Sequence, residues 1–311
     1  MRFWAAALAL TVLLTSCVSM PLVEEASAGD HENQVLELSR AEVKAQSRSG
    51  VLAVTAQAPF QQVGFWFEGE APTQIMARTP NGDWQPVEIV HSEAGIYVGR
   101  LRLAEPASHL ELQGAQDLSL IRLEFFPEIP EPAKPAQIKS ELKEVLPSFV
   151  VTRQSWRARA PVCNGSSHTP RYLTIHHTAG AASEVDPAAV MRSIQSYHID
   201  VNGWCDIGYH FLVSHNGTIF QGRDTVLRQG AHVGGHNQDN VGISLMGNFE
   251  KETVGSTQWN SLVRIASWLS NTYSIAKDRN HILGHQEWPV QSTLCPGQDL
   301  LERLGDLAAA I

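Results

Sequence analysis

A proline-rich stretch between residues 127 and 147 divides this chain of 311 residues into two parts. It contains the run Pro-Glu-Ile-Pro-Glu-Pro-Ala-Lys-Pro together with alternating Glu and Lys. Proline fixes φ and cannot donate a backbone hydrogen bond, so this composition favours an extended, semi-rigid linker. We therefore place a domain boundary at residues 127–148, with one folded domain on each side of it.

The chain begins with a segment that has the form of a signal peptide. Residues 1–16 carry one positive charge, Arg2, and an apolar run from residue 3 to residue 14. That run is too short to span a bilayer as a mature helix, and its length suits a signal-peptide core. Removing it leaves enough chain for two domains of ordinary size.

The apolar run ends in Leu-Thr-Ser-Cys17, which resembles the lipobox of bacterial lipoproteins. The resemblance implies that Cys17 is acylated and becomes the first residue of a membrane-anchored mature protein. An ordinary secretory signal with a stray cysteine is the alternative. Val18 favours the outer membrane if the cell is Gram-negative, so the expected location is the cell envelope. Residues 17–33 are mostly small and polar and suit a tether.

Between residues 34 and 126, short β-like runs alternate with turn signals, and no helix-period segment of useful length competes with them. The runs lie at residues 51–55, 63–67, 96–103 and 119–125. Regular short strands predict an all-β, sandwich-like domain, whose role the sequence does not reveal. Its aromatic residues could form a sugar-binding surface, although core packing is the commoner use of such side chains. The residues in question are Phe65, Trp66, Phe67 and Trp84.

Composition excludes one class of partner and draws attention to histidine and cysteine. The chain has 32 Asp plus Glu against 23 Lys plus Arg, which is no nucleic-acid signature. Thirteen histidines is a high count. If Cys17 carries lipid, then Cys163, Cys205 and Cys295 remain. Outside the cytoplasm two of these can pair, and the third is then available for a special role.

The second domain contains a strand-like run that leads into two adjacent histidines. Residues 172–175 read as a short strand, and His176 and His177 follow it. Successive strand side chains point to opposite faces, so both rings cannot enter one pocket. One of them could bind a metal while the other supports the site or contacts substrate. By itself such a pair is more often structural, so its meaning depends on the rest of the domain.

Helix and strand signals alternate through the rest of the domain, at residues 149–311. Asp186 suits a helix N-cap with Pro187 in the first turn, and residues 215–218 read as a hairpin turn. This order predicts an α/β domain with a central mixed sheet and flanking helices. The expected helices are 186–198, 257–273 and 299–310, and the expected strands are 172–175, 203–213, 219–223, 240–248 and 281–284.

Six segments of this domain, in this order, resemble zinc-dependent N-acetylmuramoyl-L-alanine amidases, which share a fold with peptidoglycan recognition proteins. The resemblance covers residues 150–311, about half of the chain. The segments are Ile-His-His-Thr-Ala from 175, Trp-Cys-Asp-Ile-Gly-Tyr-His-Phe from 204, Gly-Ala-His from 230, Gly-Ile-Ser-Leu-Met-Gly-Asn from 242, Gly-His from 284, and Thr-Leu-Cys-Pro-Gly from 293.

The resemblance implies one zinc ion per chain and a set of residues with assigned roles. The metal ligands would be His176, His285 and Cys295, and the catalytic pair would be Tyr209 and Thr293. Substrate contacts would come from His177, His198 and His232, with Arg223 and Asn240 as weaker candidates. Cys163 and Cys205 are then the disulfide candidates, consistent with an oxidising compartment.

The spacing departs from the family in one place. His285 and Cys295 enclose nine residues, two more than family members usually have. The extra pair falls within residues 287–290, and a surface loop tolerates such an insertion at small entropic cost. We keep the ligand assignment and expect one wall of the cleft to differ.

The residue types agree with the chemistry of amide hydrolysis. Three nitrogen and sulfur ligands leave a fourth position for water, as in catalytic zinc sites. Zinc lowers the pKa of its bound water to ~7 and polarises a carbonyl, while Tyr209 could donate to the developing oxyanion. The expected function is cleavage between N-acetylmuramic acid and L-alanine in peptidoglycan, by a lipoprotein that remodels or recycles cell wall. The alternatives are a non-catalytic peptidoglycan sensor and a lipoprotein that tethers membrane to wall.

Overall fold

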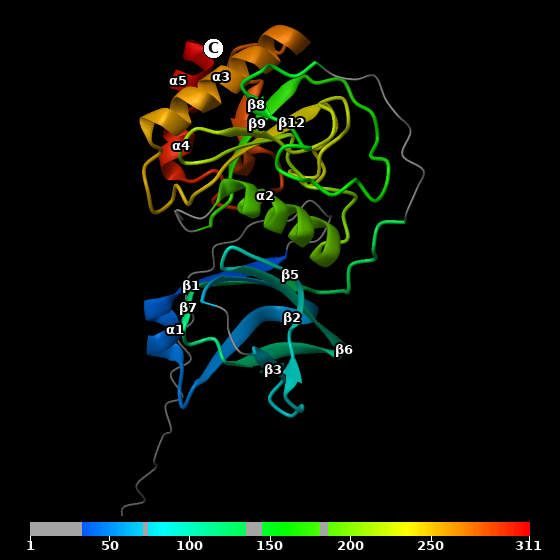
Figure 1. Cartoon of the computed structure of the whole chain (residues 1–311), viewed down its shortest axis with the longest axis vertical. Helices are drawn as coiled ribbons and strands as arrows, with labels where there is room; N and C mark the ends of the chain where they lie inside the picture. Colours follow the sequence, from blue (N-terminus) through cyan, green and yellow to red (C-terminus); the bar gives the residue numbers. More distant parts are fainter. Residues whose placement is uncertain (1–32, 71–73, 135–144, 181–185) are drawn as a thin grey trace, which may run out of the picture.

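The chain forms two separate β-sheets, one from residues that precede the proline-rich segment in the sequence and one from residues that follow it (Figure 1). The computed structural model describes residues 33–70, 74–134, 145–180 and 186–311. The first sheet is antiparallel, in the order β1-β7-β2-β6-β3-β4, with β5 paired to β6. Its elements are β1 (Gln34–Ser39), α1 (Arg40–Gln46), β2 (Val51–Gly69), β3 (Met76–Arg78), β4 (Gln85–Pro86), β5 (Glu88–Glu93), β6 (Ile96–Gln113) and β7 (Leu118–Phe126).

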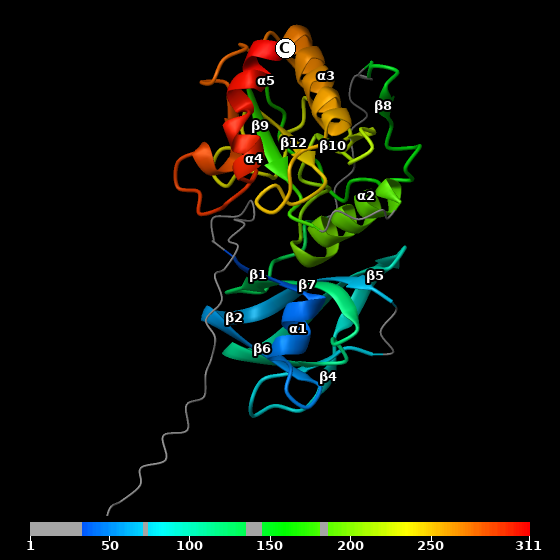
Figure 2. The same cartoon turned by 90° about the vertical axis from the view of Figure 1, so that its left-hand side faces the viewer.

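The first domain is β-rich as predicted, but its two main strands are much longer than expected. The expected runs at 51–55 and 63–67 are both parts of the single strand β2, and β6 is of similar length. The pairing of β2 with β6 changes register between Thr55 and Gln62. Such an irregularity bends a strand without ending it. One continuous sheet therefore curves around its own apolar cluster (Figure 2).

A short helix, α1, interrupts this β domain and was missed by the sequence reasoning. Ser39 caps it, because its hydroxyl accepts from the Glu42 N–H while the Glu42 carboxylate accepts from the Ser39 N–H. This Ser-x-x-Glu pattern is a recognised helix-start signal and was visible in the sequence. Val43 is the buried residue of this helix, and it packs in the apolar cluster of the sheet.

The second sheet is mixed, in the order β13-β9-β12-β10-β11-β8, and only β10 and β11 are antiparallel. This agrees with the predicted α/β class. Its strands are β8 (Val150–Val151), β9 (Tyr172–His177), β10 (Phe211–Val213), β11 (Ile219–Gln221), β12 (Asn240–Leu245) and β13 (Ile282–Gly284). The helical elements are α2 (Pro187–Ser196), the π-helix (Tyr197–Val201), α3 (Ser256–Tyr273), a 3-10 turn (His285–Glu287), α4 (Gln298–Glu302) and α5 (Leu304–Ala310).

Helices cover both faces of the second sheet, and the alternation along β9 decides which side chains meet which helix. Leu173 and Ile175 point into the larger apolar cluster, which α3 and the C-terminal helices complete. Helix α2 covers the other face through Met191 and Ile194. It lies between this sheet and the β domain (Figures 1 and 2).

Two elements differ from expectation, and one helix start agrees with it. The predicted strand at 203–213 is regular only at Phe211–Val213, because the backbone before it bonds to the π-helix and to a loop. Trp204 N donates to His198 O, and Ala231 N donates to Gly208 O. The expected closing helix is two helices, α4 and α5, separated at Arg303. Asp186 caps α2 as predicted, and its carboxylate accepts from the Ala188 N–H.

The predicted signal peptide and Cys17 lie outside the described residues, as does most of the tether. Among the residues that the structure does describe, no helix combines the length and the apolar character needed to cross a membrane. Membrane attachment therefore stays a prediction from the lipobox-like sequence.

Candidate metal centre

Strand β9 ends in two histidines whose rings lie in different surroundings. The His176 ring is buried, with its centroid 4.7 Å from that of His285 and 5.1 Å from that of Tyr209. The His177 ring lies beside Phe249, and its Nδ1 accepts from the Phe249 N–H at 3.2 Å. The pleat of the strand thus sends one ring into a polar cluster and the other toward the core, as expected.

Three possible metal-binding side chains converge beside His176. His176, His285 and Cys295 offer ligand atoms that all lie within 4.8 Å of one another, and all three residues are buried. They come from the end of β9, the turn after β13, and the turn before α4. Because β9 and β13 are parallel neighbours, their carboxyl ends meet at one edge of the sheet. That topology brings together residues that are far apart in the chain.

The hydrogen bonds around His176 fix which ring nitrogen carries a proton. His232 Nε2 lies 3.2 Å from the backbone oxygen of Asn240, which can only accept, so Nε2 donates. A neutral His232 then has a lone pair on Nδ1, which lies 3.0 Å from His176 Nε2. His176 must donate there, and its own Nδ1 keeps a lone pair. That Nδ1 lies 3.5 Å from the Cys295 sulfur.

The same reasoning applies to His285. The Gln291 amide nitrogen donates to the carbonyls of Gly234 and Pro289, so its Oε1 is the acceptor at 3.1 Å from His285 Nε2. His285 Nε2 is therefore protonated, and Nδ1 is free to bind a cation. Both histidines have the arrangement of metal ligands, in which the second ring nitrogen is held by an outer partner.

Burial sets the charge of this cluster. It lowers the pKa of His176 well below its ordinary value, that of His285 to about 4 and that of His232 to about 3, so all three are neutral at pH 7. Burial raises the pKa of Cys295 to about 12. A bound divalent cation would reverse that preference, because it stabilises the thiolate directly. Two neutral imidazoles and one thiol fit a metal of borderline softness.

Tyr209 lies in the segment before β10 and is next to His176. Its ring centroid lies 5.1 Å from that of His176 and 5.7 Å from that of His198. The ring is partly exposed, and burial of the hydroxyl raises its pKa above the ordinary value of 10. The phenol therefore keeps its proton at pH 7 and can donate a hydrogen bond.

Comparison with known proteins assigns this domain. Residues 166–298 match the N-acetylmuramoyl-L-alanine amidase family. Peptidoglycan-recognition protein SC2 of Drosophila simulans is 34% identical over 160 residues, which cover 50% of this chain and 84% of that protein. Peptidoglycan recognition protein 1 of Mus musculus is 31% identical over 159 residues, covering 50% and 85%.

The chain belongs to the family of N-acetylmuramoyl-L-alanine amidases and peptidoglycan recognition proteins. A solved structure of peptidoglycan recognition protein-LE in complex with tracheal cytotoxin, a monomeric diaminopimelic acid-type peptidoglycan, is 32% identical. The alignment covers 50% of this chain and 92% of that one, with a TM-score of 0.47. The family match at residues 166–298 lies within the second domain, which we call the amidase domain.

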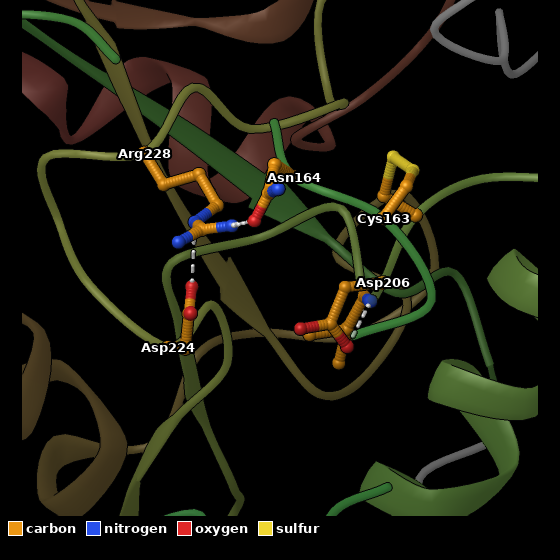
Figure 3. The surroundings of a disulfide bond; sticks show 7 residues. Cys163, Asn164, Asp206, Asp224 and Arg228 are labelled. Atoms are coloured by element: carbon orange, nitrogen blue, oxygen red, sulfur yellow. Dashed lines mark hydrogen bonds and ion pairs between the residues drawn. A yellow bond between two sulfur atoms is a disulfide. The ribbon is translucent and has the colours of Figure 1, made fainter. Parts of the chain in front are cut away.

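A disulfide joins Cys163 and Cys205, the two cysteines that the resemblance had suggested (Figure 3). It attaches the loop before β9 to the segment that leads into Tyr209. Next to it, the buried Asp206 carboxylate accepts from Gln195 at 2.6 Å and from its neighbour Ile207 N–H at 2.8 Å. These contacts hold the irregular backbone of residues 203–210 in place without strand pairing.

The residues predicted to contact substrate divide into exposed and buried ones. His198 is partly exposed beside Tyr209 and Trp204. The side chains of His177, His232, Arg223 and Asn240 are buried. His232 holds His176 as described above, and Asn240 accepts from Thr174 Oγ1 at 2.8 Å. Their positions fit support of the site better than direct contact with substrate.

Thr293 and Gln291 act on the loop between the second and third candidate ligands. Thr293 Oγ1 accepts from the Cys295 N–H at 3.1 Å, which fixes the turn that carries the thiol. Gln291, which holds His285, was not identified from the sequence. It lies next to the segment that is longer than in the family, where Val290 is 92% exposed. A lone glutamine in a loop gives no local signal of such a role.

Proposed function

We propose that this protein is a zinc-dependent hydrolase that cleaves the amide between N-acetylmuramic acid and L-alanine in peptidoglycan or its fragments. The observation that carries the proposal is the convergence of His176, His285 and Cys295 beside Tyr209, with Nε2 of both histidines held by an outer partner. When bound there, zinc would polarise the scissile carbonyl and lower the pKa of a bound water.

The protein's own residues have distinct tasks in this scheme. His176, His285 and Cys295 hold the ion, and His232 and Gln291 keep the two imidazoles in the tautomer that can bind it. Tyr209 is placed to donate to the oxygen on which negative charge develops. That hydrogen bond is stronger in a buried site than in water, because the effective dielectric constant is lower there.

Two other functions are compatible with the family. Some family members bind peptidoglycan without cutting it, and a wall-tethering lipoprotein would need binding alone. Members without activity typically lack one of the zinc ligands, whereas this chain has all three together with Tyr209. The complete set of residues favours hydrolysis.

Purified protein and isolated peptidoglycan separate these functions in one experiment. We expect close to one zinc per chain and, after digestion, free stem peptides together with muramic acid that lacks them, detected by mass spectrometry. Removal of zinc by a chelator should stop the release, and added zinc should restore it. Retained binding with unchanged muropeptide masses would instead support the sensor or the tether.

We also propose that the mature chain is anchored to the cell envelope through an acylated Cys17, where peptidoglycan is the adjoining polymer. The support is the lipobox-like Leu-Thr-Ser-Cys sequence after the apolar run. A Cys17→Ser protein should lose its fatty-acid label and leave the membrane fraction. A variant that still incorporates label would show that this reading of the N-terminus is wrong.

A further inference from the structure

The π-helix that follows α2 faces two ways. On one side it carries His198, whose Nδ1 accepts from the Gly208 N–H at 3.0 Å, one residue before Tyr209. On the other side Tyr197 and Val201 contact the β domain. Single turns of π-helix are rare and are frequent at functional sites. This turn therefore connects the β domain with the segment that carries Tyr209.

Buried hydrogen bonds hold the π-helix to the β domain. The Tyr197 hydroxyl donates to Glu124 at 2.8 Å, and Gln62 donates from its amide to the Val201 carbonyl at 3.0 Å. The second Glu124 oxygen accepts from Asn33 at 2.9 Å. Gln62 and Glu124 are both buried, so breaking these bonds would leave buried polar groups without any hydrogen-bond partner, which is costly. The contact is therefore well fixed in position.

Gly64 in β2 allows this close approach. A Cβ atom at that position would lie 2.3 Å from the Tyr197 hydroxyl oxygen and 2.7 Å from a Val201 methyl group. Both distances are shorter than atoms tolerate, and a glycine inside a strand commonly marks such an approach by another element. Any larger residue would have to displace the π-helix or the strand.

A second contact reaches the other side of the site. Arg122 of β7 donates from Nη1 to the Thr178 carbonyl at 2.8 Å. Thr178 directly follows His177 at the end of β9. Arg122 and Glu124 are two residues apart on one strand, so their side chains leave the same face of the sheet. One face of β7 thus contacts both the strand end near His176 and the helix that carries His198.

We propose that the β domain is a positioning element of the amidase site, in which Gly64 and Glu124 set the place of the π-helix and, through His198, that of Tyr209. This inference rests on the proposed hydrolytic function. It assigns a role to a domain that lies outside the matched amidase region. The competing explanation is that the interface only joins two domains and does not influence the position of Tyr209 or of the metal centre.

The full-length Gly64→Ala protein tests the proposal, with Gly99→Ala as its matched control. Gly99 lies in β6 opposite Phe65, and the three atoms nearest to a Cβ there belong to Val87, Glu88 and Ile89 of the β domain itself. We expect Gly64→Ala to keep its zinc while kcat falls about 10- to 100-fold, since small misplacements of catalytic groups cost that much. KM should change little, because the lost contact is one made in the transition state. Gly99→Ala should keep wild-type kcat.

Tyr197→Phe is a second variant, for the case that Gly64→Ala does not fold. It removes the hydroxyl that donates to Glu124 and adds no atom, so a smaller fall in kcat is expected. The His198 ring resonances, observed after selective labelling of histidine, should shift in Gly64→Ala and in Tyr197→Phe but not in Gly99→Ala. Equal kcat in Gly64→Ala and Gly99→Ala, or unchanged His198 resonances in the first, would overturn the inference.

These readouts also keep the two proposals apart. If the wild-type protein releases no stem peptide, the proposed hydrolytic function is wrong. The His198 resonances then still report whether the β domain sets the position of the π-helix. If the wild type is active and the Gly64→Ala protein equals it, the positioning role alone is wrong.

Discussion

The two domains bury different kinds of side chain. In the described part of the β domain the interior is almost entirely apolar, with Phe65, Leu110 and Leu123 among its fully buried residues. Four polar side chains are buried there, namely Asn33, Gln62, Glu68 and Glu124. The amidase domain buries many more, including six histidines at 168, 176, 177, 210, 232 and 285. Buried polar groups are costly, so their concentration marks where the chemistry is placed.

The four exceptions in the β domain have a feature in common. Gln62 and Glu124 bond to the π-helix, and Asn33 bonds to Glu124. Glu68 accepts from the indole of Trp66, which packs against Tyr197. The polar interior of the β domain is therefore directed at its neighbour. This indicates a domain that supports a site rather than one that carries its own.

The largest difference between the domains should appear when one buried side chain is removed from each. His176→Ala should lose most of its zinc and, if the proposed hydrolysis holds, nearly all turnover, while the fold survives because no core packing is removed. Phe65→Ala should instead cost about 3–5 kcal/mol of unfolding free energy through lost packing. Metal analysis, turnover and urea denaturation of both proteins provide the check. Unchanged zinc content in His176→Ala would remove that residue from the ligand set.

Tyr209→Phe tests the mechanism rather than the metal. The change deletes one donor and keeps the ring, so folding and zinc content should be preserved. Losing an oxyanion donor typically lowers turnover ~100- to 1,000-fold, about 3–4 kcal/mol in the barrier. Single-turnover release of stem peptide measures it. Turnover near the wild-type value would leave the other residues of the centre to act alone.

The disulfide should matter to the amidase domain alone. Cys163 and Cys205 are 42 residues apart, and closing a loop of this length stabilises a fold by about 4 kcal/mol in the chain-entropy description. The double variant Cys163→Ala, Cys205→Ala should therefore unfold at lower urea concentration. Hydrogen exchange should rise in the segment before Tyr209 and stay constant in β2 and β6. Faster exchange in the β domain as well would mean that the two domains unfold together.

Acidification should act on the two regions with opposite sign. The buried histidines have a folded-state pKa below 6.5, with His177 and His232 at about 3, so the unfolded chain binds more protons below pH 6.5. Stability is lost as pH falls from ~6.5 toward ~4, by at most about 1.4 kcal/mol per pH unit for each such histidine. Zinc-free protein should show this loss in urea titrations at pH 7, 6 and 5.

The buried carboxyl groups of the β domain have the opposite effect on stability when the pH falls. Burial raises the pKa of Glu68 and Glu124 above 4.5, so the folded state holds their protons longer and gains stability as pH falls toward 4.5. Glu124→Gln removes one of these groups, and its stability should decline more steeply with acid than that of the wild type. A shallower decline would contradict the sign derived for this carboxyl group.

The structure brings together the three predicted ligands, and each of them stands at the end of a regular element or next to one. His176 follows the β-like residues of β9, His285 follows β13, and Cys295 precedes the Pro-Gly before α4. Such positions are fixed by local pattern and by parallel pairing. The strand expected at 203–213 was wrong over residues 203–210, because the apolar and aromatic residues there resemble a strand while the backbone bonds to the π-helix and to loops.

The rest could not be predicted because it depends on contacts between distant segments. Tyr197 and Glu124 are 73 residues apart, and neither residue type announces the bond. Gly64 is ordinary in a strand until the π-helix approaches it. The long strand β2 was expected as two short strands because Pro59 lies in its middle, and proline cannot donate a hydrogen bond to a neighbouring strand. In each case the feature depends on tertiary contacts or context that the local sequence does not show.

The tautomers fixed by Asn240, His232 and Gln291 also determine the charge of the filled centre. Both imidazoles are neutral before an ion arrives, so metal capture at neutral pH releases a single proton, from Cys295. A divalent ion with one thiolate then leaves a net charge of about +1 inside a buried pocket. Protons therefore compete with the metal at one sulfur, and the apparent affinity should rise about tenfold per pH unit near neutrality. A substrate carbonyl would meet a centre with one uncompensated positive charge.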